Sequence, residues 1–155
     1  MVTAGAVRNV VVLGATGSIG DSTFRVLENL GSAFRVIAMS GSEQLDKLAL
    51  LAEKWKPRYL CIGRVDKMAE LAGSAEKVLG GEEGLEVLAT LPEADLVVNG
   101  LVGAVGLRPT LAALQAGKVV AMANKEPLVI AGGILLEAAR SGGGEIIPLD
   151  SEPNA

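Results

Sequence analysis

The sequence contains no histidine and only one cysteine, Cys61. The missing histidines exclude a Ser-His-Asp triad, a histidine general base and a histidine-ligated metal within this chain. A single thiol cannot build a disulfide framework or a zinc site made of several thiolates. Any chemistry in the chain must therefore use carboxylates, lysine, hydroxyl groups, tyrosine or Cys61 itself.

Aromatic residues are also scarce, at 3% of 155 residues, and no block of Lys or Arg occurs. The formal net charge of -4 argues against a broad nucleic-acid footprint and favours small ligands. The longest apolar run, residues 127–136, contains two glycines and is well short of the roughly 20 residues that span a bilayer. No secretory signal pattern opens the chain. We therefore expect no nucleic-acid partner and no membrane partner.

Glycine, in contrast, is abundant. The chain has 20 glycines, about 13% of its length against roughly 7% in an average protein. Half of the residues are hydrophobic, which is enough for the core of one ordinary domain. Short β-branched runs predict strands over residues 10–13, 34–39, 59–62, 77–79, 95–99, 118–122 and 145–147. Helical spacing predicts helices after Gly20 and over residues 45–55, 67–71, 82–90, 107–116 and 134–140.

This alternation of strands and helices predicts the fold class. Most of the strands are continuously apolar, as strands buried on both faces are. We therefore expect a doubly wound parallel α/β sheet, a Rossmann-like dinucleotide-binding domain. Ligands of such sheets bind beyond the carboxyl ends of the strands, so the residues that follow strands are the candidate site residues.

The first strand ends in Gly14-Ala15-Thr16-Gly17-Ser18-Ile19-Gly20, a G-x-x-G-x-x-G turn that precedes a helix. Glycines at such a turn let the backbone approach a pyrophosphate and let the helix pack closely on the strand. The N–H groups at the helix N-terminus favour phosphates, and the hydroxyls of Thr16 and Ser18 add donors. The pattern favours dinucleotide binding over a turn that serves packing alone.

The end of the second strand selects the nucleotide in such folds. An acid there binds a ribose 2′-hydroxyl, whereas a base accepts a 2′-phosphate. In this chain Ser40, Gly41 and Ser42 are followed by Glu43. Ser40 or Ser42 could donate to a phosphate, which Glu43 would repel if it pointed inward. For Glu43 we favour a first-turn acid that faces solvent and complements the helix dipole.

Two polar segments follow later strands. Asn124-Lys125-Glu126 comes directly after residues 118–122 and should lie at the mouth of the same crevice. Asp150-Ser151-Glu152 follows the last strand, and in an extended chain its two carboxylates point to one side while Ser151 points away. Paired carboxylates suit Mg2+ or Mn2+, with other oxygen ligands completing the coordination. Taken alone, each segment could equally be a solvated loop or tail.

In this order, the segments together resemble the 1-deoxy-D-xylulose 5-phosphate reductoisomerase family of non-mevalonate isoprenoid biosynthesis. The glycine turn is similar to the family's NADPH-binding turn. Residues 99–107 with Pro109-Thr110 are similar to its G-x-x-G-L-x-P-T segment, residues 123–126 to its A-N-K-E segment and residues 149–155 to its D-S-E-H-N-A motif. The resemblance implies that residues 1–150 are the NADPH-binding domain and that residues 151–155 begin a catalytic domain, which continues beyond this chain.

The resemblance also implies an enzyme that uses NADPH and Mg2+ or Mn2+ to convert 1-deoxy-D-xylulose 5-phosphate to 2-C-methyl-D-erythritol 4-phosphate. By that resemblance Lys125, Ser151 and Glu152 contact the sugar-phosphate substrate, and Asp150 and Glu152 ligate the metal. The implied NADPH contacts are Thr16, Gly17, Ser18, Ile19, Gly41, Ser42, Asn124 and Glu126. The parent would be a homodimer of the bacterial cytoplasm or of a plastid. This chain alone is expected to fold and to bind dinucleotide weakly without turning over substrate.

The chain departs from the family at three positions. Pro127 stands where the family has Ser, Pro153 where it has His, and Glu43 where it commonly has a basic or neutral residue. Each proline removes a backbone N–H next to residues whose orientation matters. Glu43 bears on the choice between NADPH and NADH.

Two other functions stay open. A semialdehyde dehydrogenase or acyl-phosphate reductase also begins with a GATG-type turn, but it needs a nucleophilic cysteine. Cys61 lies instead in an expected buried strand. A non-catalytic dinucleotide-binding module would bind nucleotide without any effect of metal or of Asp150.

Overall fold

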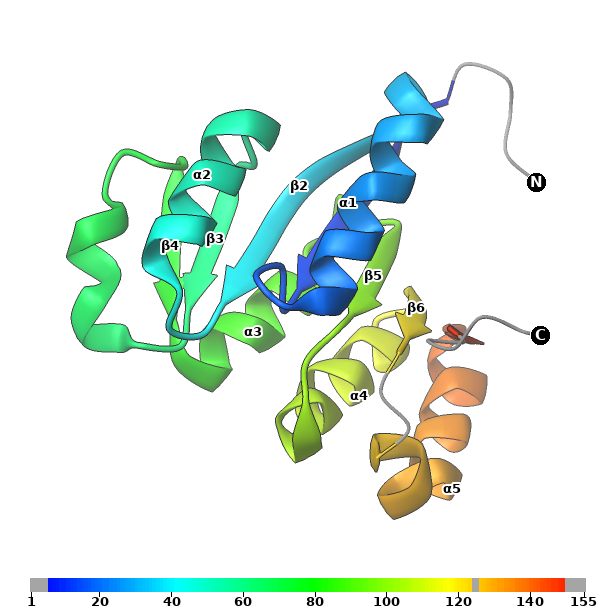
Figure 1. Ribbon diagram of the computed structural model, residues 1–155. Helices are drawn as coiled ribbons and strands as arrows, with labels where there is room; N and C mark the ends of the chain where they lie inside the picture. Colours follow the sequence, from blue (N-terminus) through cyan, green and yellow to red (C-terminus); the bar gives the residue numbers. More distant parts are fainter. Residues whose placement is uncertain (1–5, 124–125, 150–155) are drawn as a thin grey trace.

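The structure is a computed structural model that describes residues 6–123 and 126–149 (Figure 1). Its described residues form one seven-stranded sheet in the order β4-β3-β2-β1-β5-β6-β7, and every neighbouring pair of strands is parallel. The strands are β1 (Arg8–Leu13), β2 (Phe34–Gly41), β3 (Tyr59–Ile62), β4 (Lys77–Gly80), β5 (Leu96–Asn99), β6 (Val119–Met122) and β7 (Glu145–Pro148). After β1 the chain adds β2, β3 and β4 on one side of that strand, and it then returns to add β5, β6 and β7 on the other side. The strand order therefore reverses between β1 and β5, which is where ligands of such sheets bind.

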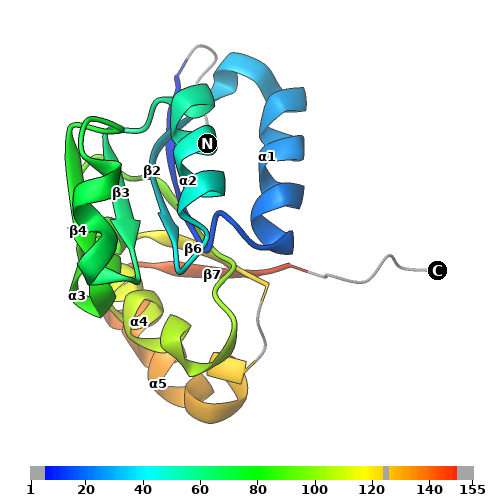
Figure 2. The ribbon, with the colours of Figure 1, turned by 60° about the vertical axis from the view of Figure 1, so that its left-hand side comes forward.

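Helices cover the sheet in two groups (Figures 1 and 2). The helices α1 (Ser18–Leu30) and α2 (Leu45–Trp55) lie on one face. The other face carries α3 (Gly81–Ala89), α4 (Leu107–Gln115) and α5 (Glu126–Gly142). Short 3-10 segments η1 (Gly31–Ala33), η2 (Val65–Leu71) and η3 (Gly103–Gly106) complete the connections. None of the described helices has the length and hydropathy of a membrane span.

The central strands build two apolar layers because successive side chains point to opposite faces of a sheet. Val10 and Val12 of β1 pack with Phe24 of α1 in one core cluster. Val11 and Leu13, the alternate residues of the same strand, belong to the cluster on the other face with residues of α3, α4 and α5. All four are at most 1% exposed. This two-sided burial confirms the predicted doubly wound parallel sheet.

An apolar groove of about 400 Å³ remains beside α1, between that helix and strands β5 and β6. Val26 and Leu30 of α1 form one wall, with Val98, Ala121 and Leu149 across from them. Val26 is 55% exposed and Leu30 is 48% exposed. The helices on the α1 face therefore cover β5 and β6 less completely than they cover β1 and β2.

One predicted element is clearly wrong in extent. The helix expected over residues 134–140 begins at Glu126, eight positions earlier, and runs to Gly142 with a kink at Ala131 (φ -136°, ψ 30°). The helix continues through Gly132 and Gly133 and bends just before them, at Ala131. Pro127 is buried in the first turn of α5, where its missing N–H would have no intrahelical acceptor.

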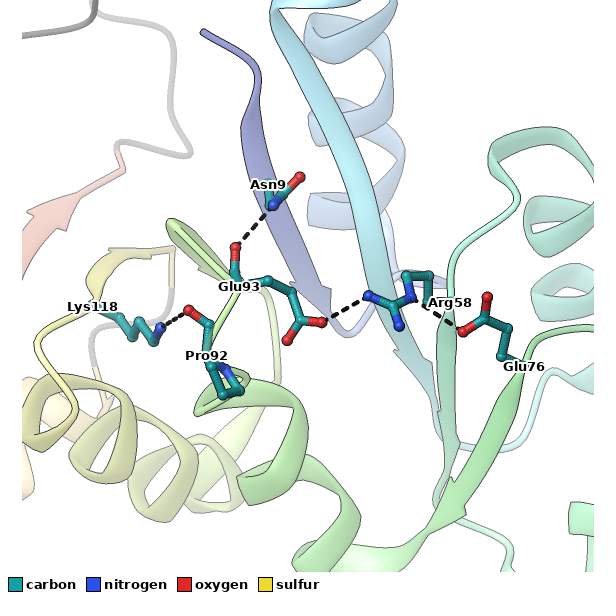
Figure 3. Close-up of polar contacts among 6 residues, drawn as sticks. All are labelled: Asn9, Arg58, Glu76, Pro92, Glu93 and Lys118. Atoms are coloured by element: carbon teal, nitrogen blue, oxygen red, sulfur yellow. Dashed lines mark hydrogen bonds and ion pairs between the residues drawn. The ribbon is translucent and has the colours of Figure 1, made fainter.

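The edge at the amino ends of the strands is held by polar contacts of the loop that precedes β5 (Figure 3). Asn9 Nδ2 donates to the carbonyl oxygen of Glu93 at 2.9 Å. Arg58 bonds the Glu93 carboxylate at 2.9 Å and the Glu76 carboxylate at 3.1 Å. Lys118 Nζ donates to the carbonyl oxygen of Pro92 at 3.3 Å. These contacts tie β1, β3 and β6 together at the edge opposite the candidate site residues.

Candidate functional site

The glycine turn after β1 is fixed by close backbone contact with the loop after β5. Gly14 has φ +77°, which favours glycine, and a Cβ placed on it would lie 2.9 Å from the carbonyl carbon and oxygen of Gly100. The N–H of Gly100 donates to the carbonyl oxygen of Leu13 at 2.9 Å. Ile19 of α1 packs on the same loop, since a Cβ on Gly100 would lie 3.0 Å from the Ile19 Cβ. Only glycine at positions 14 and 100 allows this approach.

Ser40 at the end of β2 clamps the turn from the other side. Its hydroxyl oxygen accepts a hydrogen bond from the N–H of Gly14 at 2.9 Å, and its carbonyl oxygen accepts one from Ala15 at 2.7 Å. Ser40 is 1% exposed. Ser40, one of the two serines predicted as possible phosphate donors, is thus buried and accepts a hydrogen bond that supports the turn.

Lys47 of α2 holds the next residue of the turn. Its Nζ donates to the carbonyl oxygen of Thr16 at 2.8 Å and pairs with Asp21 of α1 at 3.0 Å. Nothing in the local pattern links Lys47 to Thr16, which lies 31 residues earlier. The contact joins α1, α2 and the turn into one unit.

The N-terminus of α1 opens beside this supported turn. Gly17 is the N-cap residue, and among the described residues no side chain caps the helix there. The first intrahelical bond runs from the N–H of Asp21 to the carbonyl oxygen of Gly17 at 3.0 Å. The N–H groups of Ser18, Ile19 and Gly20 precede it and have no acceptor within the helix. Three donors and the positive end of the helix dipole thus meet at one point, as an anion site requires.

The described candidate residues gather at this edge of the sheet. Thr16, at 7% exposed, packs on Gly41, since a Cβ on Gly41 would lie 3.2 Å from Thr16 Cγ2. Gly17, Ser18 and Ser42 are exposed beside them. The structure therefore brings together six of the predicted NADPH contacts: Thr16, Gly17, Ser18, Ile19, Gly41 and Ser42.

Glu126, the seventh described candidate, lies on the β5–β6 side of the same edge. It is the first residue of α5 and is exposed. A Cβ on Gly103 of η3 would lie 3.9 Å from Glu126 Oε2. The predicted residues Asn124, Lys125, Asp150, Ser151 and Glu152 lie outside the described residues. Within residues 6–123 and 126–149, no three Asp, Glu or Cys side chains gather as metal ligands.

The loop after β5 is organised by a buried amide, Asn99. Its Nδ2 donates to the carbonyl oxygen of Gly106 at 3.1 Å and to Thr110 Oγ1 at 2.6 Å. Its Oδ1 accepts from the N–H of Leu101 at 3.1 Å. Asn99 is 2% exposed and Thr110 is 1% exposed. The sequence motif contains both residues, but their pairing became visible only in the fold.

Two hollows flank the end of β2. One, of about 160 Å³, is lined largely by small and apolar residues, including Gly63, Gly81, Leu101 and Val105. The other is lined mainly by charged side chains, and Glu43 is one of them. Glu43 is exposed, as predicted. It does not lie in the first turn of α2, however, because that helix begins at Leu45 and its first-turn acid is Asp46.

Cys61 does not have the environment of a nucleophile. It lies in β3 at 1% exposed, and its Sγ is 3.6 Å from the carbonyl oxygen of Gly81. Burial raises the pKa of the Cys61 thiol to about 11. Because the thiolate is the reactive form, a buried and protonated thiol counts against the semialdehyde dehydrogenase alternative.

We expect a thiol reagent to leave Cys61 unlabelled in the folded chain at about pH 8 and to label it in urea, because the native thiol is buried and protonated.

The raised pKa of Cys61 also makes the stability of the fold depend on pH. The stabilisation is present below the reference pKa of 9.0 and is lost as pH rises toward about 11, because the unfolded chain releases the proton first. Unfolding curves of the wild type and Cys61→Ala across this pH range measure the effect. Rapid labelling of the native chain, or equal pH slopes for the two proteins, would contradict it.

Comparison with known proteins agrees with this geometry. A model for the 1-deoxy-D-xylulose 5-phosphate reductoisomerase family matches residues 10–132. The reductoisomerase of Oleidesulfovibrio alaskensis is 44% identical over 153 residues, which are 96% of this chain and 38% of the relative. A crystal structure of DOX-P reductoisomerase with NADPH, fosmidomycin and magnesium superposes with a TM-score of 0.89 at 39% identity. That match covers 94% of this chain and 37% of the other.

The Zymomonas mobilis enzyme in complex with NADPH gives a TM-score of 0.87 at 38% identity, over 95% of this chain and 40% of that one. The chain thus spans about two fifths of the length of the proteins it matches. Because the family model covers most of its residues, and because related proteins share both its sequence and its sheet, the chain belongs to the 1-deoxy-D-xylulose 5-phosphate reductoisomerase family.

Proposed function

We propose that this chain is the NADPH-binding part of a reductoisomerase that converts 1-deoxy-D-xylulose 5-phosphate to 2-C-methyl-D-erythritol 4-phosphate with a divalent metal. The observation that carries the proposal is the turn from Gly14 to Gly17, held by Ser40 and Lys47 with the N-terminus of α1 open beside it. NADPH complexes of two related enzymes support the choice of ligand. The proposed compartment is the bacterial cytoplasm, with a homodimeric parent.

The described residues fit a dinucleotide. The N–H groups of Ser18, Ile19 and Gly20 would bind the pyrophosphate, and the Ser18 hydroxyl would add a donor. Gly17 is exposed, so backbone and phosphate can approach there without a side chain between them. Gly41 and Ser42 would contact the adenosine half, beside the small hollow at the end of β2.

The remaining roles fall on residues outside the described ranges or at their border. Asn124 and Glu126 would complete the cofactor contacts, and Lys125 would hold the substrate. Asp150 and Glu152 would ligate Mg2+ or Mn2+, and Ser151 and Glu152 would contact the substrate. When bound, the nicotinamide supplies hydride chemistry and the divalent ion supplies Lewis acidity toward substrate oxygens. What this chain contributes is the orientation of the nucleotide at the edge of the sheet.

The nucleotide site is tested by titrating the chain with NADPH and following nucleotide fluorescence. We expect saturable binding, which Ser18→Asp weakens about tenfold, because a carboxylate at the helix N-terminus repels the pyrophosphate. An acid in the first turn also stabilises the helix, so the loss does not reflect unfolding. Ser32→Asp, beyond the opposite end of α1, is the matched control and should bind as the wild type does.

Absence of saturation at about millimolar NADPH or NADH, or equal binding by Ser18→Asp and the wild type, would overturn the proposed site. The same preparation also tests whether this chain alone can catalyse the reaction.

We expect no steady NADPH oxidation with 1-deoxy-D-xylulose 5-phosphate and Mn2+, because the chain spans about two fifths of its relatives' length. Steady turnover would show that this chain is sufficient for catalysis.

A further inference from the structure

An acidic side chain lies beside the proposed nucleotide site. Asp21 is in the first turn of α1 and directly follows the three residues whose N–H groups have no acceptor within the helix. An acid in this turn stabilises the helix, because it faces the positive end of the helix dipole. The same negative charge repels an anionic ligand at that end. The affinity of the site for a pyrophosphate therefore depends on what neutralises Asp21.

The side chain that neutralises Asp21 is Lys47 of α2. Its Nζ lies 3.0 Å from Asp21 Oδ1 and donates a hydrogen bond to the carbonyl oxygen of Thr16 at 2.8 Å. One ammonium group thus bridges the first turn of α1 and the glycine turn before it. While both side chains are present, their charges cancel at the N-terminus of the helix. Without Lys47, one negative charge would be left there.

The bond to Thr16 fixes where this positive charge lies. The carbonyl and the N–H of a trans peptide point in opposite directions. The Thr16 carbonyl faces Lys47, and the N–H of the same peptide, which belongs to Gly17, donates to the carbonyl oxygen of Gly14 at 3.3 Å. Gly17 is the N-cap residue of α1. The ammonium group is therefore held one peptide away from the residue at which the helix begins.

The Lys47–Asp21 pair lies partly in solvent, with 36% of the lysine side chain and 47% of the aspartate side chain exposed. Ion pairs this exposed add little to folding stability, because water and salt screen them. Their charges still act on a ligand within a Debye length, which is about 10 Å at 0.1 M salt. Loss of Lys47 should therefore affect nucleotide binding more than the stability of the fold.

A second bridge between the same two helices provides an internal comparison. The helices α1 and α2 lie side by side (Figure 2), and Lys54 of α2 pairs with Glu28 of α1. Each of these residues comes seven positions after its counterpart in the first bridge. Seven residues of α-helix rise about 10 Å. The second bridge thus carries the same charges between the same helices, but it lies about 10 Å further from the N-terminus of α1.

We infer that Lys47 is a positioning residue of the nucleotide site: by neutralising Asp21, it allows the N-terminus of α1 to bind a pyrophosphate. The inference rests on the proposed nucleotide-binding function and adds to that site a residue from another helix. Lys47 acts through the charge of Asp21, and the glycine turn and the helix N–H groups bind the nucleotide.

The test is titration of the wild type and of variants with NADPH at low ionic strength, followed by nucleotide fluorescence. Lys47→Met should weaken binding about tenfold, because it leaves the Asp21 carboxylate unpaired beside the pyrophosphate. The double variant Lys47→Met, Asp21→Asn should bind within about threefold of the wild type, because the repelling charge is then also gone. Lys47→Arg keeps the positive charge and should bind as the wild type does.

The matched control is Lys54→Met, which removes the same charge from the second bridge. It should leave the NADPH dissociation constant unchanged. Thermal unfolding of each variant shows whether it is folded. Salt gives a readout that a purely structural role of Lys47 would not move: the loss in Lys47→Met should shrink to less than about threefold at 1 M salt, where the Debye length is about 3 Å.

The outcomes separate this inference from the proposed function. If the wild type shows no saturable NADPH binding, the proposed function is wrong and the inference fails with it. If the wild type binds but Lys47→Met binds equally well, only the inference fails. It also fails if Asp21→Asn does not restore the affinity of Lys47→Met, or if Lys54→Met loses as much affinity as Lys47→Met does, because Lys47 would then act by joining the helices and not by its charge.

Discussion

Replacing Gly20 by alanine is expected to lower the free energy of unfolding by about 3 kcal/mol, as overpacking at a site that cannot relax does. Gly20 is a buried residue of α1. A Cβ at this position would lie 2.1 Å from the carbonyl oxygen of Ala15 and 2.8 Å from its Cα. Both atoms belong to the backbone of the glycine turn, which Ser40 and the loop after β5 hold in place. The new methyl group could fit only if helix and turn moved apart.

The matched control is Gly133→Ala, which makes the same change at an exposed position of α5. A Cβ at Gly133 meets nothing within 4 Å. Alanine lacks the backbone entropy cost of glycine in a helix, so this variant should gain about 0.5 kcal/mol or more. Urea unfolding of both variants against the wild type measures the contrast. A Gly20→Ala protein within about 0.5 kcal/mol of the wild type would show that α1 does not approach the turn so closely.

The same glycines show how far sequence reasoning reaches. The G-x-x-G-x-x-G spacing predicted a strand, a turn and a helix, because chain direction and steric freedom are local properties. It places Thr16, Gly17 and Ser18 beside a helix N-terminus at the carboxyl edge of the sheet, although the helix expected after Gly20 begins three residues earlier, at Ser18. Strand β3 was likewise predicted at its observed bounds, since a short apolar run ends there at a glycine.

The residues that support the turn were not predictable in the same way. Ser40 reaches Gly14 across 26 positions and Lys47 reaches Thr16 across 31. Both contacts depend on the register of neighbouring strands and on the placement of α2, which no local pattern encodes. The sequence offers Ser40 and Ser42 equally as phosphate donors, and only the fold shows that Ser40 supports the turn.

Helix α5 shows a different limit. Gly132 and Gly133 carry the local signal of a break, and Pro127 carries the signal of a start or an interruption. Packing on the sheet decided the outcome: Ala131, Leu135 and Ala138 are buried along one side of the helix. Tertiary burial therefore outweighed the low helix propensity of the two glycines, and the helix is irregular just before them, at the kink at Ala131.

Asn99→Ala is expected to cost about 2 to 3 kcal/mol of unfolding free energy, because it removes two buried hydrogen bonds and one partly buried bond, and water cannot freely replace them. Those bonds run to Gly106, Thr110 and Leu101 and close the loop between β5 and α4. Gly106 packs against the same amide, since a Cβ there would lie 3.0 Å from Asn99 Nδ2. The shortened side chain would leave space that the glycine cannot fill.

Asn9→Ala is the appropriate comparison, because it truncates the same residue type on the adjacent strand. The Asn9 amide makes one bond, to the carbonyl oxygen of Glu93 at 2.9 Å, at a partly buried position. Its loss should cost under about 1 kcal/mol. Urea midpoints of the two variants measure the difference in stability. The stability losses of Thr110→Val and Asn99→Ala should add to more than the loss of the double variant, because the two side chains share one hydrogen-bond network. Equal costs at positions 9 and 99, or strict additivity with Thr110→Val, would mean that the loop after β5 is positioned by packing, with the buried amide adding nothing of its own.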